Sequence, residues 1–142
     1  MFDDEIRARA AISRTLAAAA QAGDARKADA YAACFTEHGA LQLEQTITGR
    51  EAIRQWMLAP SPIPQPKDRP AGFVSHHLTT CRIELTGEQT ATVRTYWLVT
   101  SPAGLDHNGY YDDRFHKEGD EWLIEHRRPR TLWIADNSLL RG

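Results

Sequence analysis

Cysteine is scarce in this sequence. Only Cys34 and Cys81 occur, and they lie in different predicted segments. Two distant cysteines provide neither the framework of a disulfide-stapled fold nor the closely spaced thiolates of a structural zinc site. We therefore expect both to be buried, unpaired thiols, as in cytosolic proteins.

Long apolar runs are also absent. No stretch approaches the length that a bilayer-spanning helix requires. The N-terminus, MFDDEIRAR, carries acids where an export signal would carry basic residues. The sequence therefore predicts a cytoplasmic protein without a membrane partner.

Neither sign of charge dominates. The 17 basic and 19 acidic residues leave a formal net charge of −2, and no block of like charge forms a basic patch. We therefore expect no nucleic-acid partner. The sequence also lacks a glycine-rich phosphate loop, a G-x-S-x-G turn and an H-E-x-x-H pair, and its six histidines do not have metal-ligand spacing. These absences predict acid–base chemistry with no cofactor and no metal.

The apolar pattern predicts helices followed by strands within one domain, residues 1–142. Helices are expected over residues 3–23 and 26–36, and a third begins near residue 50. Alternation predicts strands over 40–47, 72–85, 90–100, 105–116 and 122–133, the last four joined by compact turns. The proline-rich segment 60–70 is either a surface connector or a flap over an opening. This order predicts an α+β fold with helices on one face of a curved sheet.

Two adjacent histidines open the strand predicted over residues 72–85. Because neighbours in a strand point to opposite faces, only one of His76 and His77 can face inward. Alternation from Cys81 and Ile83 places His77 on the inward side. A β-bulge between the histidines and Cys81 would reverse this and turn His76 inward. An inward histidine is either a structural residue or a catalyst.

Asp24 follows the first predicted helix directly. Its side chain either caps the next helix or is buried. A buried carboxylate needs a cationic or hydrogen-bonding partner. If the partner is a histidine, the carboxylate fixes the imidazole tautomer and leaves one ring nitrogen able to remove a proton.

Tyr111 shares one face of its predicted strand with His107 and Asp113. A phenol that faces a cavity can donate a hydrogen bond to a developing oxyanion, whereas most tyrosines in sheets serve for packing. Arg127 and Arg128 point to opposite faces of the last strand, so that one of them is a candidate for an inward charge.

Several short motifs resemble a known family. In chain order they are AYAACFTEHGAL after a helix that ends in aspartate, then TGREAI, SHHLTTCRI, NGYYDDRF and GDEWLIEHRR. On these the chain resembles a SnoaL-like member of the NTF2-like superfamily, in the scytalone dehydratase and dehydrochlorinase branch. The resemblance covers nearly the whole chain. It implies a cone in which three N-terminal helices pack on a strongly curved, mostly antiparallel sheet that encloses a pocket.

The resemblance also selects residues. The branch has an aspartate eleven residues before an aromatic residue, as Asp24 lies before Phe35, and a histidine seven residues before a branched apolar residue, as His76 lies before Ile83. The dehydrochlorinase has an arginine five residues after the tryptophan of the final strand, and Arg127 has that spacing. Enzymes of this branch use such an Asp–His pair to eliminate water or chloride.

We therefore expect a cofactor-free lyase, such as a dehydratase, or an isomerase, acting on a small hydrophobic or aromatic-like molecule. His76 would be the general base and Asp24 its partner, while Tyr111 or Arg127 would stabilise negative charge on the substrate. Further candidates for the pocket are His77, His107, Trp56 and Phe73.

The alternative is a non-catalytic binding or assembly module, such as the small subunit of an aromatic-ring hydroxylase. The segment TLWIADNSLL, residues 131–140, would supply its interface. With either function the resemblance implies a homo-oligomer, a dimer or a trimer.

Overall fold

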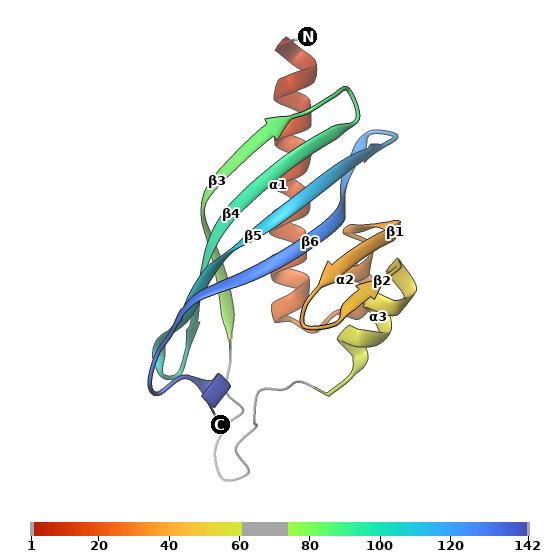
Figure 1. Ribbon diagram of the computed structural model, residues 1–142. Coiled ribbons are helices and arrows are strands. Elements are labelled where there is room, and N and C mark those ends of the chain that lie inside the picture. The colour runs from red at the N-terminus through yellow and green to blue at the C-terminus, as the bar shows by residue number, and fades with distance from the viewer. Residues whose placement is uncertain (1, 61–73, 142) are drawn as a thin grey trace.

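The computed structural model describes residues 2–60 and 74–141. Its centre is an antiparallel meander of four long strands, β3 (Ser75–Leu85), β4 (Thr90–Ser101), β5 (Gly104–Glu118) and β6 (Glu121–Ile134). These strands confirm the antiparallel order expected from the compact turns between them. The sheet is curved along its length (Figure 1).

Two shorter strands complete a six-stranded mixed sheet. β1 (Phe35–Gln42) pairs in parallel with β6 and antiparallel with β2 (Thr46–Thr48), which gives the order β2-β1-β6-β5-β4-β3. The strand expected over residues 40–47 is therefore two strands with a turn between them. Leu43 N–H closes this turn on the Gln45 carbonyl at 3.2 Å.

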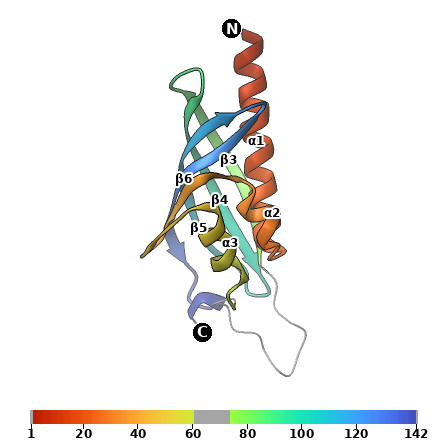
Figure 2. The ribbon, with the colours of Figure 1, turned by 90° about the vertical axis from the view of Figure 1, so that its right-hand side faces the viewer.

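Helices pack on one face of the sheet. The long helix α1 (Phe2–Asp24) contacts both β3 and β6, so that it crosses that face (Figure 2). α2 (Ala28–Ala32) and α3 (Arg50–Leu58) follow it and pack on each other. A single 3-10 turn, η1 (Leu139–Arg141), comes last among the described elements. The α+β fold with three helices on a curved sheet is as expected.

The core lies between α1 and the sheet. Ile12 and Leu16 supply the buried side of α1, at the helical spacing that predicted it, and they belong to one buried cluster with Phe35, Phe115 and Ile124. The helix is further tied to the sheet because Thr15 Oγ1 donates a hydrogen bond to the Trp122 carbonyl at 2.6 Å. The position of the C-terminal end of α1, where Asp24 lies, is therefore fixed relative to the strands.

The helix expected over residues 26–36 was wrong in its second half. Only Ala28–Ala32 are α-helical, and Phe35 already pairs with Ile124 of β6. Ile124 N–H donates to the Cys34 carbonyl at 2.8 Å, so the parallel pairing begins there. Long-range strand pairing thus overrides the local helical pattern.

Two sequence predictions concern residues that the structure does not describe. Most of the proline-rich segment, and with it the candidate Phe73, lies outside the described residues. Within the described residues, no helix is both long and apolar enough to cross a membrane.

The prediction that both cysteines are buried was wrong for Cys81, which lies exposed on the edge strand β3, whereas Cys34 is buried.

Candidate functional site

A β-bulge in β3 decides which histidine faces inward. The register of β3 on β4 shifts between Leu78 and Cys81. Within this interval two residues of β3 lie opposite one residue of β4, which is the arrangement of a β-bulge. His76, opposite the fully buried Val99, is thereby on the same face as Ile83, opposite the buried Val93. The bulge required by the family spacing is confirmed, and alternation alone was wrong.

Asp24 and His76 contact each other through two hydrogen bonds. Asp24 Oδ1 lies 2.6 Å from His76 Nδ1, and Asp24 Oδ2 accepts the His76 backbone N–H at 2.8 Å. β3 is an edge strand, so this backbone N–H is free to bond to a residue outside the sheet. Both side chains are partly buried, with 21% of Asp24 and 30% of His76 exposed. Asp24 is thus the last residue of α1 and binds β3, instead of capping α2.

The contact fixes the chemistry of the imidazole. A carboxylate at Nδ1 holds the proton on that nitrogen, which leaves the Nε2 lone pair free to accept a proton. His76 Nε2 has no hydrogen-bond partner among the described residues. Asp24 also lies at the negative end of the α1 dipole, where a cation is favoured. Carboxylate and helix end together stabilise the imidazolium that proton transfer to His76 would form.

Trp97 lies at the centre of a ring cluster on the inward face. Its indole centroid is 6.0 Å from the His76 ring, 5.7 Å from the Tyr111 ring and 5.5 Å from the His107 ring. Only 5% of the residue is exposed. The three rings therefore surround a buried indole supplied by β4.

Beneath Tyr111 lies a buried ion pair. Arg127 donates from Nε and Nη2 to the two carboxylate oxygens of Asp113, both at 2.9 Å. The Tyr111 ring lies over the guanidinium, with the ring centroid 3.9 Å from the central carbon of Arg127. Burial raises the pKa of Tyr111, so its hydroxyl keeps its proton at neutral pH and remains a donor. Arg127 is inward, as one of the two arginines was expected to be, but Asp113 offsets its charge.

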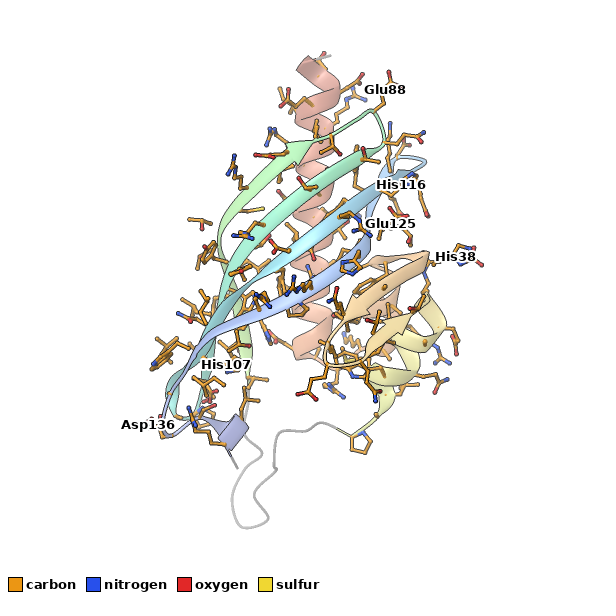
Figure 3. All side chains as sticks on the ribbon, in the orientation of Figure 1. His38, Glu88, His107, His116, Glu125 and Asp136 are labelled. Carbon is orange, nitrogen blue, oxygen red and sulfur yellow. The ribbon has the colours of Figure 1, made fainter. Side chains whose placement is uncertain are left out.

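His107 has a carboxylate partner of its own. His107 Nδ1 lies 2.7 Å from Asp106 Oδ1, and Asp106 also accepts hydrogen bonds from the hydroxyls of Ser101 and Ser138 and from the Leu139 backbone N–H. Burial would raise the pKa of Asp106, but these hydrogen bonds outweigh it and hold the pKa below its ordinary value. His107 lies near the end of β5 that approaches the C-terminal segment, whereas His116 lies near the other end of β5 and His38 lies on β1 (Figure 3).

Glycine at position 109 allows Trp97 to lie where it does. A Cβ at Gly109 would be 1.9 Å from the Arg130 carbonyl oxygen and 2.7 Å from Trp97 Cζ2. Trp97 and Gly109 are opposite each other in the β4–β5 pairing. The glycine thus permits close approach of the indole to the β5 backbone.

We expect Gly109→Ala to destabilise the fold by about 2 kcal/mol, because the methyl group overpacks the interior and displaces the indole. Denaturant unfolding measures the loss. Gly23→Ala is the control, since a Cβ there meets only Tyr31 ring atoms at 3.6 Å. Equal unfolding midpoints for the two variants would contradict the expectation.

Three other residues considered from the sequence are not part of the ring cluster around Trp97. His77 was expected inward by alternation, but it is exposed on the opposite face, with Nε2 3.0 Å from Thr100 Oγ1. Trp56 lies on α3 and is 37% exposed, with its ring 6.4 Å from Tyr31. Arg128 lines a depression on the outer face of the sheet. Within the described ranges, no group of three or more His, Cys, Asp or Glu is arranged to hold a metal ion.

Trp97 and Asp106 were missed by sequence reasoning. Trp97 alternates correctly with the buried Val93 and Val99, so its inward direction was available from the pattern. Its neighbours come from other strands, and no local pattern indicates them. No pattern in the sequence indicated Asp106, because its partners Ser101, Ser138 and Leu139 belong to other segments of the chain.

Solved structures resemble this chain over nearly its whole length. A protein of unknown function from Mycobacterium tuberculosis is 24% identical, with 99% of this chain and 86% of that one covered and a TM-score of 0.80. A scytalone dehydratase-like protein from Novosphingobium aromaticivorans is 22% identical, with 96% and 91% covered and a TM-score of 0.77. A hexachlorocyclohexane dehydrochlorinase from Novosphingobium barchaimii is 15% identical, with 95% and 93% covered and a TM-score of 0.79. At these identities the likeness shows the fold alone.

No curated protein sequence matches the chain significantly. A family model does match, the SnoaL-like domain, over residues 4–128. That range includes most of α1, the whole sheet up to Arg128 and every residue of the ring cluster around Trp97. On this match, which covers most of the chain, the chain belongs to the SnoaL-like domain family.

Proposed function

We propose that the protein is a cofactor-free acid–base enzyme, a dehydratase-type lyase or an isomerase, that acts on a small hydrophobic or aromatic-like molecule. The contact between Asp24 Oδ1 and His76 Nδ1 at 2.6 Å carries the proposal, because it leaves Nε2 as the free base. The rings of Trp97 and Tyr111 beside it favour a flat apolar ligand.

The proposed reaction begins with proton removal from carbon. His76 Nε2 takes the proton, and the electron pair of the broken C–H bond either expels a leaving group or moves into a conjugated system. The Asp24 carboxylate, 2.6 Å from Nδ1, stabilises the imidazolium that results. Such general base catalysis contributes about 10²–10⁴-fold to the rate.

Tyr111 is assigned the stabilisation of negative charge on the substrate. Its hydroxyl stays protonated because burial raises its pKa, so that it can donate to a developing oxyanion. Arg127 is assigned a positioning role. Two of its nitrogens are occupied by Asp113, and its guanidinium holds the Tyr111 ring from below. These roles are proposals that rest on where the side chains lie.

The test uses a flat probe that needs only a base. In 5-nitrobenzisoxazole, removal of the C–H proton breaks the N–O bond and releases a coloured nitrile phenolate, without cofactor or water as reactant. We expect His76→Ala to lower kcat/KM for this probe by about 100-fold or more. Asp24→Asn is expected to lower it also, because the amide no longer stabilises the imidazolium.

His77→Ala is the matched control. It removes the neighbouring histidine, which is exposed on the opposite face of the same strand, and we expect unchanged turnover. Circular dichroism and unfolding curves establish that each variant is folded. Turnover that is no faster with the wild type than with His76→Ala, or that falls equally in His77→Ala, would contradict the proposal.

A second candidate function, a binding or assembly module, is supported by exposed apolar residues near the C-terminal end. Leu132, Trp133 and Leu140 are 60%, 47% and 45% exposed, within the segment expected to form an interface. This function predicts that Trp133→Ser changes the mass of the particle measured by light scattering, while the His76-dependent turnover of 5-nitrobenzisoxazole is absent. A homo-oligomer with turnover would favour the enzyme.

A further inference from the structure

Two ring nitrogens in the cluster around Trp97 have no hydrogen-bond partner among the described residues. Trp97 is 5% exposed, yet its Nε1 has no hydrogen-bond partner among the described residues. A buried donor without an acceptor costs about 1–3 kcal/mol. Its ring lies between those of His76 and His107, beside the base of the proposed reaction. The unpaired N–H therefore indicates a place for an acceptor atom of a ligand.

The second atom is Nε2 of His107. The residue is 8% exposed, and its Nδ1 is held by Asp106 at 2.7 Å, so in the neutral ring Nε2 carries the lone pair. Nε2 has no partner in the described part of the chain. Anchoring of the C-terminal segment needs only the Asp106 carboxylate, through Ser138 and Leu139. It does not account for an imidazole with its second nitrogen left free next to Trp97.

We propose that Trp97 Nε1 and His107 Nε2 form a binding subsite for a hydroxyl group of the ligand, as in a phenol. A hydroxyl oxygen accepts one hydrogen bond and its proton makes another. Trp97 supplies the donor and His107 supplies the acceptor, so the pair matches a hydroxyl and leaves neither atom unpaired. An ether in the same position would satisfy Trp97 and leave His107 without a donor.

Asp106 fixes this preference. By accepting from Nδ1 it selects the tautomer in which Nε2 is the acceptor, as outer carboxylates do for other functional histidines. The carboxylate is fully buried and held by hydrogen bonds from Ser101 and Ser138, so its position is rigid. The subsite deepens the proposed function, on which it rests only for the role of His76, because it gives the substrate a hydroxyl group across the Trp97 indole from the base.

The experiment compares two probes that differ in one group. 4-Nitrophenol carries the hydroxyl and 4-nitroanisole carries a methyl ether in its place, and binding is measured at a pH where the phenol is neutral. We expect the wild-type protein to bind 4-nitrophenol about 10-fold more tightly than 4-nitroanisole. Trp97→Phe, which keeps an aromatic ring but removes the N–H, is expected to weaken binding of both probes, since each oxygen accepts from Nε1. His107→Phe, which removes the acceptor, is expected to abolish the preference.

Trp133→Phe is the matched control, because Trp133 is 47% exposed. It should leave both affinities and the preference unchanged. If His107→Phe does not fold, the indole N–H signal of Trp97 in the wild type, assigned from its loss in Trp97→Phe, gives an independent measurement. We expect it to shift when 4-nitrophenol binds. An unshifted signal, equal binding of the two probes by the wild type, or a full preference in folded His107→Phe would overturn the subsite.

Failure of the subsite and failure of the proposed function can be told apart. If 4-nitrophenol is preferred through His107 while turnover of 5-nitrobenzisoxazole does not depend on His76, the subsite stands and the enzyme assignment fails. If turnover depends on His76 while the two probes bind equally, the enzyme assignment stands and the subsite is wrong.

Discussion

Asp113→Asn is expected to lower the free energy of unfolding by about 3–5 kcal/mol, the cost of breaking a buried ion pair from one side. The Asp113 side chain is fully buried and that of Arg127 is 3% exposed, so water cannot replace the lost carboxylate. Burial alone would lower the pKa of Arg127, but Asp113 outweighs it and raises the pKa, so the guanidinium stays charged. The variant therefore leaves a buried cation without its counter-ion.

The control for this variant is the neighbouring residue on the same strand. Asp112 pairs with Arg94 through two hydrogen bonds of 2.7 and 3.0 Å, but the two side chains are 38% and 47% exposed. We expect Asp112→Asn to cost less than about 1 kcal/mol, because water solvates the arginine that remains. Urea unfolding of both variants is the measurement. Similar losses would mean that burial is not what makes the Asp113 pair costly to break.

Asp106→Ala is expected to lower the free energy of unfolding by about 3 kcal/mol, because it leaves several buried donors without an acceptor. Those donors are the hydroxyls of Ser101 and Ser138, the Leu139 backbone N–H and His107 Nδ1. The loss should be accompanied by release of the C-terminal segment, which hydrogen exchange at Leu139 N–H would detect. Asp136→Ala is the control, since this exposed aspartate lies in the same region (Figure 3) and surface changes of this kind cost about 0.5 kcal/mol or less.

The Asp106 contribution has a definite pH dependence. Hydrogen bonds hold its pKa in the folded protein below the ordinary value, in spite of burial. A carboxyl group with a lowered pKa stabilises the fold fully above its unfolded pKa, and this stabilisation is lost as the pH falls through the folded pKa. The difference in unfolding free energy between the wild type and Asp106→Ala should therefore be constant above about pH 5 and narrow below it. A difference that grows on acidification would contradict this.

The local pattern predicted much of the fold because each long element has one buried side. Ile12 and Leu16 mark the buried side of α1, and the four meander strands begin and end within a few residues of the expected positions. The limit of the pattern appears at Phe35. Its segment has helical spacing in the sequence but forms a strand, because its backbone pairs with Ile124 far along the chain. No window of a few residues contains that partner.

The candidate site, like the fold, was predicted only in part by the sequence. The sequence by itself made Asp24 and one of two adjacent histidines the candidates, and the family spacing to Phe35 and Ile83 then selected His76. Only the tertiary structure decided that His76 meets Asp24, because a bulge in β3 turns this histidine inward and the end of α1 lies against the edge strand. It also decided that Trp97 lies between His76 and His107. Spacing along a chain predicts which residues share one face of a helix or strand. Contacts between different elements form only when the strands and the helix pack together.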